Sequence, residues 1–174
     1  MRALALFALL GVAGCGYRPV HTSHDAAKER FAVVLASSNV ADAVASDEVL
    51  AGARDELSRS GALASGDAYP RCEIEVLRAD EASEGIAAAA NGDGVLVPNA
   101  RATSIGIVAR AWIVRAKDGQ RERDTGDVRA METVSVAPDA RAATFRHVDA
   151  MRAASRRVGH RVGARILGIP TASD

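Results

Sequence analysis

Few side chains in this sequence have the types and spacing that covalent catalysis needs. The one pairing of a thiol with a base would join Cys72 to His147 or His160, and such a pair works only when its thiolate is accessible. Residues 71–77 alternate apolar and charged side chains, with Cys72 on the apolar side, as on the buried face of a strand. No serine-hydrolase elbow, zinc-protease helix, phosphate-binding loop or dinucleotide fingerprint appears. We therefore predict a buried thiol, no enzymatic activity and no cofactor.

The nearest approach to a metal-binding pair is made by His21 and His24. Zinc sites in proteins use at least three protein ligands, and a third is lacking near these two imidazoles. Residues 91–94, Asn-Gly-Asp-Gly, lack the periodic acidic ligands of a calcium loop and predict a turn instead. We therefore expect no metal site.

Three arginines on the predicted last helix repeat at intervals of four residues. Arg157, Arg161 and Arg165 would lie along one edge of that helix. Guanidinium groups in such a row could hold phosphates or an acidic partner. The same spacing also suits solvated side chains near a helix C-terminus, where the helix dipole favours positive charge. The sequence leaves both interpretations open.

The composition excludes several classes of partner. Lys and Arg number 22 and Asp and Glu also number 22, so no overall field attracts nucleic acid. Only 3% of the residues are aromatic, which leaves few rings on which sugars or bases could stack. The apolar fraction of 48% is ample for folding, but much of it is alanine, so we expect a thin core.

The first half of the chain predicts a strand, a helix and a second strand. Residues 31–35 form a continuous apolar run typical of a buried strand. Ser46 is a suitable N-cap for a helix that ends at Gly61, with apolar residues recurring on one face. Residues 71–77 supply the second strand.

The second half predicts two more strands and a long helix. Residues 103–115 have apolar side chains on both parities, residues 117–120 form a hairpin turn, and residues 128–136 return as the fourth strand. A helix from about residue 143 to 168, capped by Thr144 and ended by Gly168, completes the order. Its apolar stripe consists of Phe145, Val148, Met151, Ser155, Val158, Val162 and Ile166.

This order, β-α-β-β-β-α, predicts an α/β fold: a two-layer sandwich with two helices packed on a four-stranded mixed sheet. The opposite face of the sheet then needs cover. An uncovered face with apolar residues would be a docking surface unless residues 79–101 fold over it. That segment is long for a plain loop, so it is partly structured or functional.

The N-terminus has the features of a secretory signal. Arg2 precedes a short apolar run, and small residues lead to Cys15. The run is well below the roughly 20 residues that a membrane-spanning helix requires. The sequence Val12-Ala13-Gly14-Cys15 resembles the lipobox of bacterial lipoproteins.

That resemblance implies cleavage before Cys15 and its acylation, including a palmitate-like chain, which would anchor the protein without a spanning helix. An ordinary signal peptide with a chance cysteine is the alternative. The predicted organisation is a signal peptide over residues 1–14, a lipidated cysteine and tether over residues 15–30, one α/β domain over residues 31–169 and a tail over residues 170–174. Gly16 after the cysteine is typical of lipoproteins sent to the outer membrane.

The segment Cys15-Gly16-Tyr17-Arg18-Pro19, followed by the strand, helix and hairpin pattern and an arginine-rich last helix, resembles the LPS-assembly lipoprotein family (LptE-like). The resemblance implies a lipid-anchored protein on the periplasmic face of the outer membrane. It implies a place inside a β-barrel translocon, as plug and assembly factor, and contact with lipopolysaccharide. The alternative is another envelope lipoprotein that acts as a non-catalytic recruitment or binding module.

If lipopolysaccharide is bound, basic side chains near its phosphates would hold it. The residues expected in this role are Lys117, Arg121, Arg123, Arg157 and Arg161. Plain turn and surface charge is the alternative for all of them.

Overall fold

The computed structural model describes residues 29–90, 92–135 and 139–171. The elements are β1 (Ala32–Ser38), α1 (Ala43–Arg59), β2 (Arg71–Ala90), β3 (Leu96–Val114), β4 (Arg121–Glu122), β5 (Val128–Ser135) and α2 (Ala140–Ile166). The predicted order is therefore confirmed, with the two-residue strand β4 as an addition. The predicted signal peptide, Cys15 and the two tether histidines lie outside the described residues, as do the last three residues of the predicted tail.

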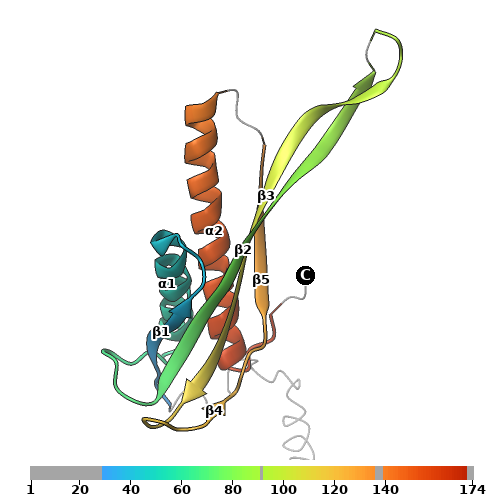
Figure 1. The fold of residues 1–174 in the computed structure, drawn as a ribbon. Coiled ribbons are helices and arrows are strands. Elements are labelled where there is room, and N and C mark those ends of the chain that lie inside the picture. Colours follow the sequence, from blue (N-terminus) through green and yellow to red (C-terminus); the bar gives the residue numbers. More distant parts are fainter. Residues whose placement is uncertain (1–28, 91, 136–138, 172–174) are drawn as a thin grey trace, which may run out of the picture.

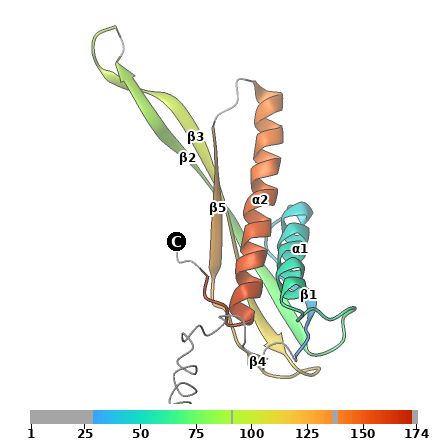
Figure 2. The ribbon, with the colours of Figure 1, turned by 180° about the vertical axis from the view of Figure 1, so that it is seen from behind.

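The sheet is mixed, and both helices lie on one of its faces (Figure 1, Figure 2). β1 runs parallel to β2, whereas β2 and β3 are antiparallel. β5 pairs antiparallel with the middle of β3, and β4 pairs with its end. This is the two-layer sandwich that the sequence predicts.

The core lies between the sheet and the two helices. Cys72, Ile74 and Val76 on β2 are fully buried, so the predicted alternation and the buried thiol are confirmed. On α2 the C-terminal part of the predicted stripe, from Ser155 to Ile166, is buried. Near the start of the helix, Phe145 is 61% exposed and Val148 is 36% exposed. These two residues lie in the first turns of α2, which run past the core, and this is why their predicted burial is wrong.

Glycines bring the two helices into backbone contact. A Cβ atom on Gly52 would lie 2.2 Å from the carbonyl oxygen of Arg156, and one on Gly159 would lie 2.1 Å from that of Val49. Later along both helices, Gly163 meets Leu57, so α1 and α2 run in the same direction. Only residues without a side chain permit this close packing.

Both predicted N-caps are wrong by about one turn. Asp42 caps α1 by accepting a 2.9 Å hydrogen bond from the Val44 N–H, while Ser46 is buried inside the helix and donates to Ser38 Oγ. Asp139 caps α2, and Thr144 donates to the carbonyl of Ala140 within the helix. In both cases an aspartate placed slightly earlier supplies an equally good acceptor. Gly61 and Gly168 follow the helix ends with positive φ, as expected.

The segment 79–101 does not fold over the open face of the sheet. It extends β2 and β3 into a long antiparallel ribbon, paired as far as Ala90 and Leu96, that projects beyond the helices (Figure 1, Figure 2). We call residues 79–101 the arm. It lies beyond the last β1 pair, at Val76, and its first residues, 79–84, still lie across β3 from β5, whose last pair is at Ala102. The turn predicted there is observed at residues 92–94, and residue 91 lies outside the described residues.

Candidate interaction surfaces

The basic hairpin residues lie at the end of the molecule opposite the arm. Lys117 and Arg123 are exposed, and within the described chain neither has an ion-pair or hydrogen-bond partner. Arg123 has a φ of 49°, which belongs to a tight turn after β4. Both side chains are therefore available to a ligand.

Arg121 has a different environment. Its guanidinium lies 3.8 Å from the centre of the Trp112 ring, and Trp112 Nε1 donates a 2.9 Å hydrogen bond to Glu73. Trp112 is only 2% exposed although it points away from the helices. Arg121 thus covers an apolar ring on the open face, which is a structural role that its position in the sequence does not reveal.

The start of the described chain is held beside this hairpin. Arg115 forms ion pairs with Glu29 and, at 2.8 Å, with Glu122. Hydrogen bonds to these two carboxylates, Glu29 first, raise the pKa of Arg115 above its ordinary value. The chain therefore enters the domain at the basic end.

The regularly spaced arginines of α2 bind the outer edge of β5. Arg157 donates to the carbonyl of Met131 at 2.8 Å and pairs with Glu132 at 2.7 Å. Arg161 donates to the carbonyl of Arg129 at 2.6 Å. Arg146 caps the end of β5 in the same way by donating to the carbonyl of Ser135, whereas Arg165 donates to that of Thr125, which precedes β5.

Carbonyl groups on an edge strand are acceptors that another chain could pair with, and these arginines occupy them. The five predicted ligand residues therefore fall into two groups: Lys117, Arg121 and Arg123 at the hairpin, and Arg157 and Arg161 along β5. The four-residue spacing of the α2 arginines was visible in the sequence. The edge of β5 that these arginines bind could not be identified from it.

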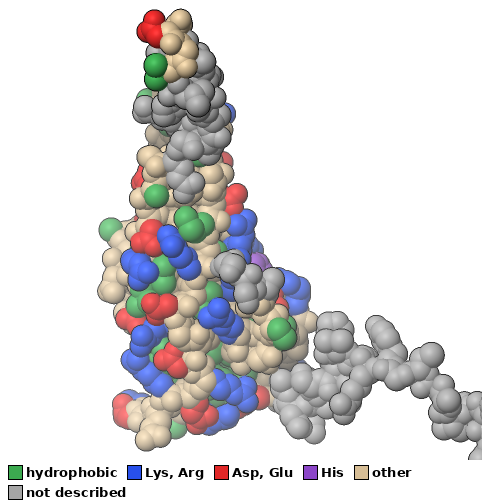
Figure 3. All heavy atoms as spheres, turned by 90° about the vertical axis from the view of Figure 1, so that its right-hand side faces the viewer, with side chains coloured by type: hydrophobic (Ala, Val, Ile, Leu, Met, Phe, Trp, Pro, Cys, Tyr) green, Lys and Arg blue, Asp and Glu red, His purple; other side chains and the backbone are tan. Residues whose placement is uncertain are grey.

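The open face of the sheet is covered by its own charged side chains (Figure 3). Asp80 pairs with Arg78 at 3.2 Å and with Arg129 at 3.3 Å. Glu75 pairs with Arg110 at 3.6 Å. Exposed pairs of this kind add little stability, but their aliphatic stems cover apolar atoms such as those of Val108, which is 1% exposed. The alternative in which this face is an apolar docking surface is therefore wrong.

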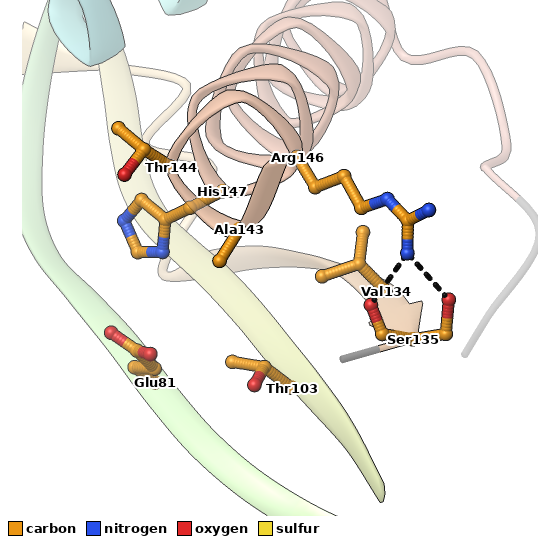
Figure 4. A pocket seen from close by; sticks show the side chains of 8 residues that line it. All are labelled: Glu81, Thr103, Val134, Ser135, Ala143, Thr144, Arg146 and His147. Carbon is orange, nitrogen blue, oxygen red and sulfur yellow. Dashed lines mark hydrogen bonds between the residues drawn. The ribbon is translucent and has the colours of Figure 1, made fainter. Parts of the chain in front are cut away.

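A groove of about 340 Å³ opens between the first turns of α2 and the base of the arm (Figure 4). His147 points from α2 toward Glu81 of β2, and Ala143 and Thr103 line the groove beside them. Arg146 turns to the other side, where it bonds Ser135. Sequence reasoning missed this groove, because its walls come from four separate elements.

The thiol and the histidines are not brought together. Burial raises the pKa of Cys72 to about 12, so a thiolate hardly forms near neutral pH. His160 instead lies beside Arg59, at 2.9 Å, and Glu56. Among the described residues, no group of three His, Cys, Asp or Glu side chains is placed to hold a metal ion. Neither α1 nor α2 has the length and hydropathy needed to cross a membrane.

One solved lipoprotein has a similar fold, and others match with lower scores. The minor lipoprotein from Acinetobacter baumannii matches with a TM-score of 0.50 and 12% identity, covering 80% of this chain and 93% of that one. A putative lipoprotein from Caulobacter crescentus CB15 matches at 0.46 and 12% identity, over 75% and 86% of the two chains. Rare lipoprotein B from Shewanella oneidensis matches at 0.37 and 12% identity, over 79% and 91%. No protein-family model and no curated protein matches the sequence. At this identity, the first likeness shows a shared fold.

Proposed function

We propose that this chain is an outer-membrane lipoprotein, anchored through Cys15 on the periplasmic face, that docks inside a β-barrel translocon as plug and assembly factor for lipopolysaccharide. The observation that carries the proposal is the charged cover over the open face of the sheet, formed by pairs such as Arg129 with Asp80. A one-sided sheet normally needs a second layer, whereas this one is polar on its outer side and suits a water-filled polar lumen.

Two other observations support the proposal. The Acinetobacter baumannii protein with the similar fold is described as a lipoprotein, which agrees with the lipobox before Cys15. The described chain also begins at Glu29, bound to Arg115 beside the basic hairpin. A lipid anchor would therefore raise the concentration of this hairpin near a membrane-bound partner.

A photo-cross-linking experiment on the lipid-anchored chain in native membranes tests the docking. Photoreactive residues replace Asp47 on α1, Arg152 on α2 and Met131 on the open face, all of which are exposed. A protein inside a lumen is surrounded, so all three positions should cross-link to the same barrel protein in equal stoichiometry. Cross-links from one side alone would instead favour the recruitment module. No barrel protein from any position would overturn the proposal.

Binding of lipopolysaccharide is tested at the hairpin. Replacing Lys117 and Arg123 with alanine should weaken binding about tenfold for each charge removed, since each would make a charge-assisted bond to phosphate. Arg152→Ala is the matched control, because Arg152 is an exposed arginine with only a 4.0 Å contact to Asp149. Equal binding by all variants would remove the hairpin from the ligand site.

A further inference from the structure

The backbone of β2 has an unpaired edge in the arm. In an antiparallel pair, alternate residues direct their N–H and C=O groups toward the partner strand. The caps on Arg129 and Met131 show that these carbonyls of β5 point outward, so the residues between them bond β3. Their opposite residues on β3, Thr103, Ile105 and Ile107, must face β5.

The residues of β3 between these three direct their N–H and C=O groups toward β2. Their partners on β2 must direct the same groups back toward β3. Ser104 pairs with Ala82 and Gly106 with Asp80, so these two residues of β2 bond inward. Ala79, Glu81 and Ser83 therefore present their N–H and C=O groups to the outer edge. Before the register shift after Val76, the same edge of β2 pairs with β1, and the last bond there is the one that the Asn39 N–H donates to the Val76 carbonyl. Beyond that bond, no described residue pairs with this edge.

The outer edge of β3 is likewise unpaired among the described residues beyond Ala102, where its pairs with β5 end, whereas β1 and β5 are capped. β5 is capped by the arginines of α2, and the outer edge of β1 is capped where Arg54 donates to the Val33 carbonyl at 3.2 Å. Native proteins cover their edge strands because an open edge pairs with other chains. Beyond Glu84 and Ala102 the arm has only two strands, and such a ribbon is marginally stable in water without a third strand.

An apolar wall accompanies the open edge. Phe145 lies 18 residues before Gly163, about five helical turns, and Val148 lies 11 residues before Gly159, about three turns. They share the face of α2 that packs on α1, but they precede the level at which α1 begins, and both are exposed. The edge of β2 thus continues past the last residue of β1, and this face of α2 continues past the first residue of α1. No element of the described chain covers either of them there.

We propose that the edge of β2 at Ala79, Glu81 and Ser83 accepts an extended segment of a partner protein as an added β-strand. Only a peptide supplies alternating donors and acceptors at the repeat of about 7 Å that the edge presents. The segment carries apolar side chains toward Phe145 and Val148. It also carries a basic residue for Glu81, an exposed carboxylate with no ion-pair partner among the described residues.

The test compares Ser83→Pro with Ser83→Ala in the full lipid-anchored chain. Proline removes the outward N–H and is tolerated at an edge, whereas alanine keeps it. A photoreactive residue at Val148 should cross-link to one extended segment of one envelope protein. Ser83→Pro should lower that yield about tenfold, the effect of losing one hydrogen bond and adding a clash, and Ser83→Ala should not.

Hydrogen exchange on the purified complex gives the second readout. Addition of a strand should slow exchange at Ala79, Glu81 and Ser83 relative to the chain alone. Unchanged exchange at these amides would overturn the proposal, as would cross-links to lipid, to a second copy or to residues 16–28 of the same chain. Equal yields from the proline and alanine variants would also overturn it.

Strand addition at β2 requires a partner protein of any identity, so its failure can be distinguished from a failure of docking inside a barrel. Cross-links to a barrel from Asp47, Arg152 and Met131, without protection of the β2 edge, would leave docking intact and remove strand addition. Protection of the edge by a segment from another envelope protein would have the opposite meaning.

Discussion

The β2–β3 ribbon runs through two regions that stabilise it differently: the body, which contains both helices, β1, β4 and β5, and the arm. In the body, helices cover one face, paired charges cover the other, and arginines bond the outer carbonyls of β5. In the arm, the ribbon has no third strand beyond Glu84 and Ala102, and no helix lies beside most of its length (Figure 1). The fold therefore concentrates its stability in one part and leaves exposed backbone in the other, which is where a partner gains most from binding.

The largest expected difference concerns Trp112. Trp112→Ala removes a ring that is 2% exposed beneath Arg121 and should lower the free energy of unfolding by about 3–5 kcal/mol. Val95→Ala at the arm turn, where the side chain is 57% exposed, should change it by less than about 0.5 kcal/mol. Urea denaturation measures both. A similar loss from the two variants would contradict the division between body and arm.

Glycine substitutions should show the same contrast with a smaller effect. Gly159→Ala places a Cβ 2.1 Å from the Val49 carbonyl and should cost about 2–3 kcal/mol as the helices separate. Gly92→Ala is the control, because nothing lies within 4 Å of its Cβ position and its φ is not positive. Thermal unfolding should separate the two variants by several degrees.

Removal of the edge caps should make β5 behave more like the arm. Arg157→Ala with Arg161→Ala should lower the free energy of unfolding by about 1–2 kcal/mol and increase self-association, measured by light scattering. Arg152→Ala removes an equal charge from α2 without uncapping a strand. If it associates as strongly as the double variant, charge loss and not the open edge is the cause.

The smallest effect at neutral pH involves Cys72. Its pKa is raised by burial from 9.0 to about 12, so the folded state holds the thiol proton more tightly than the unfolded state. The stabilisation is complete below pH 9 and is lost as the pH rises toward 12. The unfolding free energy should therefore fall in this window, and Cys72→Ala should abolish that part of the slope.

Thiol labelling extends this prediction to the arm. A maleimide should react within minutes with the thiol of a Ser83→Cys variant, because position 83 is exposed. Cys72 should react only as fast as the body unfolds. Fast labelling of Cys72 in the unmodified chain would show that the body is not closed.

The elements of the body were predictable because each has one buried face. The alternation around Cys72 and the parity of Ile105, Ile107 and Ile113 both follow from that face. The arm was not predictable, since none of its side chains that the structure describes is buried and nothing imposes a period of two on residues 79–101.

The candidate sites were less accessible to sequence reasoning. Arg121, Arg157 and Arg161 were singled out by charge and spacing, but their contacts with Trp112 and β5 depend on the register of β3. The open edge likewise depends on the register shift after Val76, which decides that Ala79, Glu81 and Ser83 face outward. Such one-residue shifts have no signature in composition or periodicity.

The arginine caps on β5 have a consequence for the order of synthesis. The three caps, Arg146, Arg157 and Arg161, all belong to α2, which follows β5 in the chain, so the strand is synthesised before the side chains that cover it. Loss of α2 would leave these β5 carbonyls without their donors, and it would also remove core residues such as Val158 and Val162. An intact α2 is therefore needed both to close the core and to cover this edge.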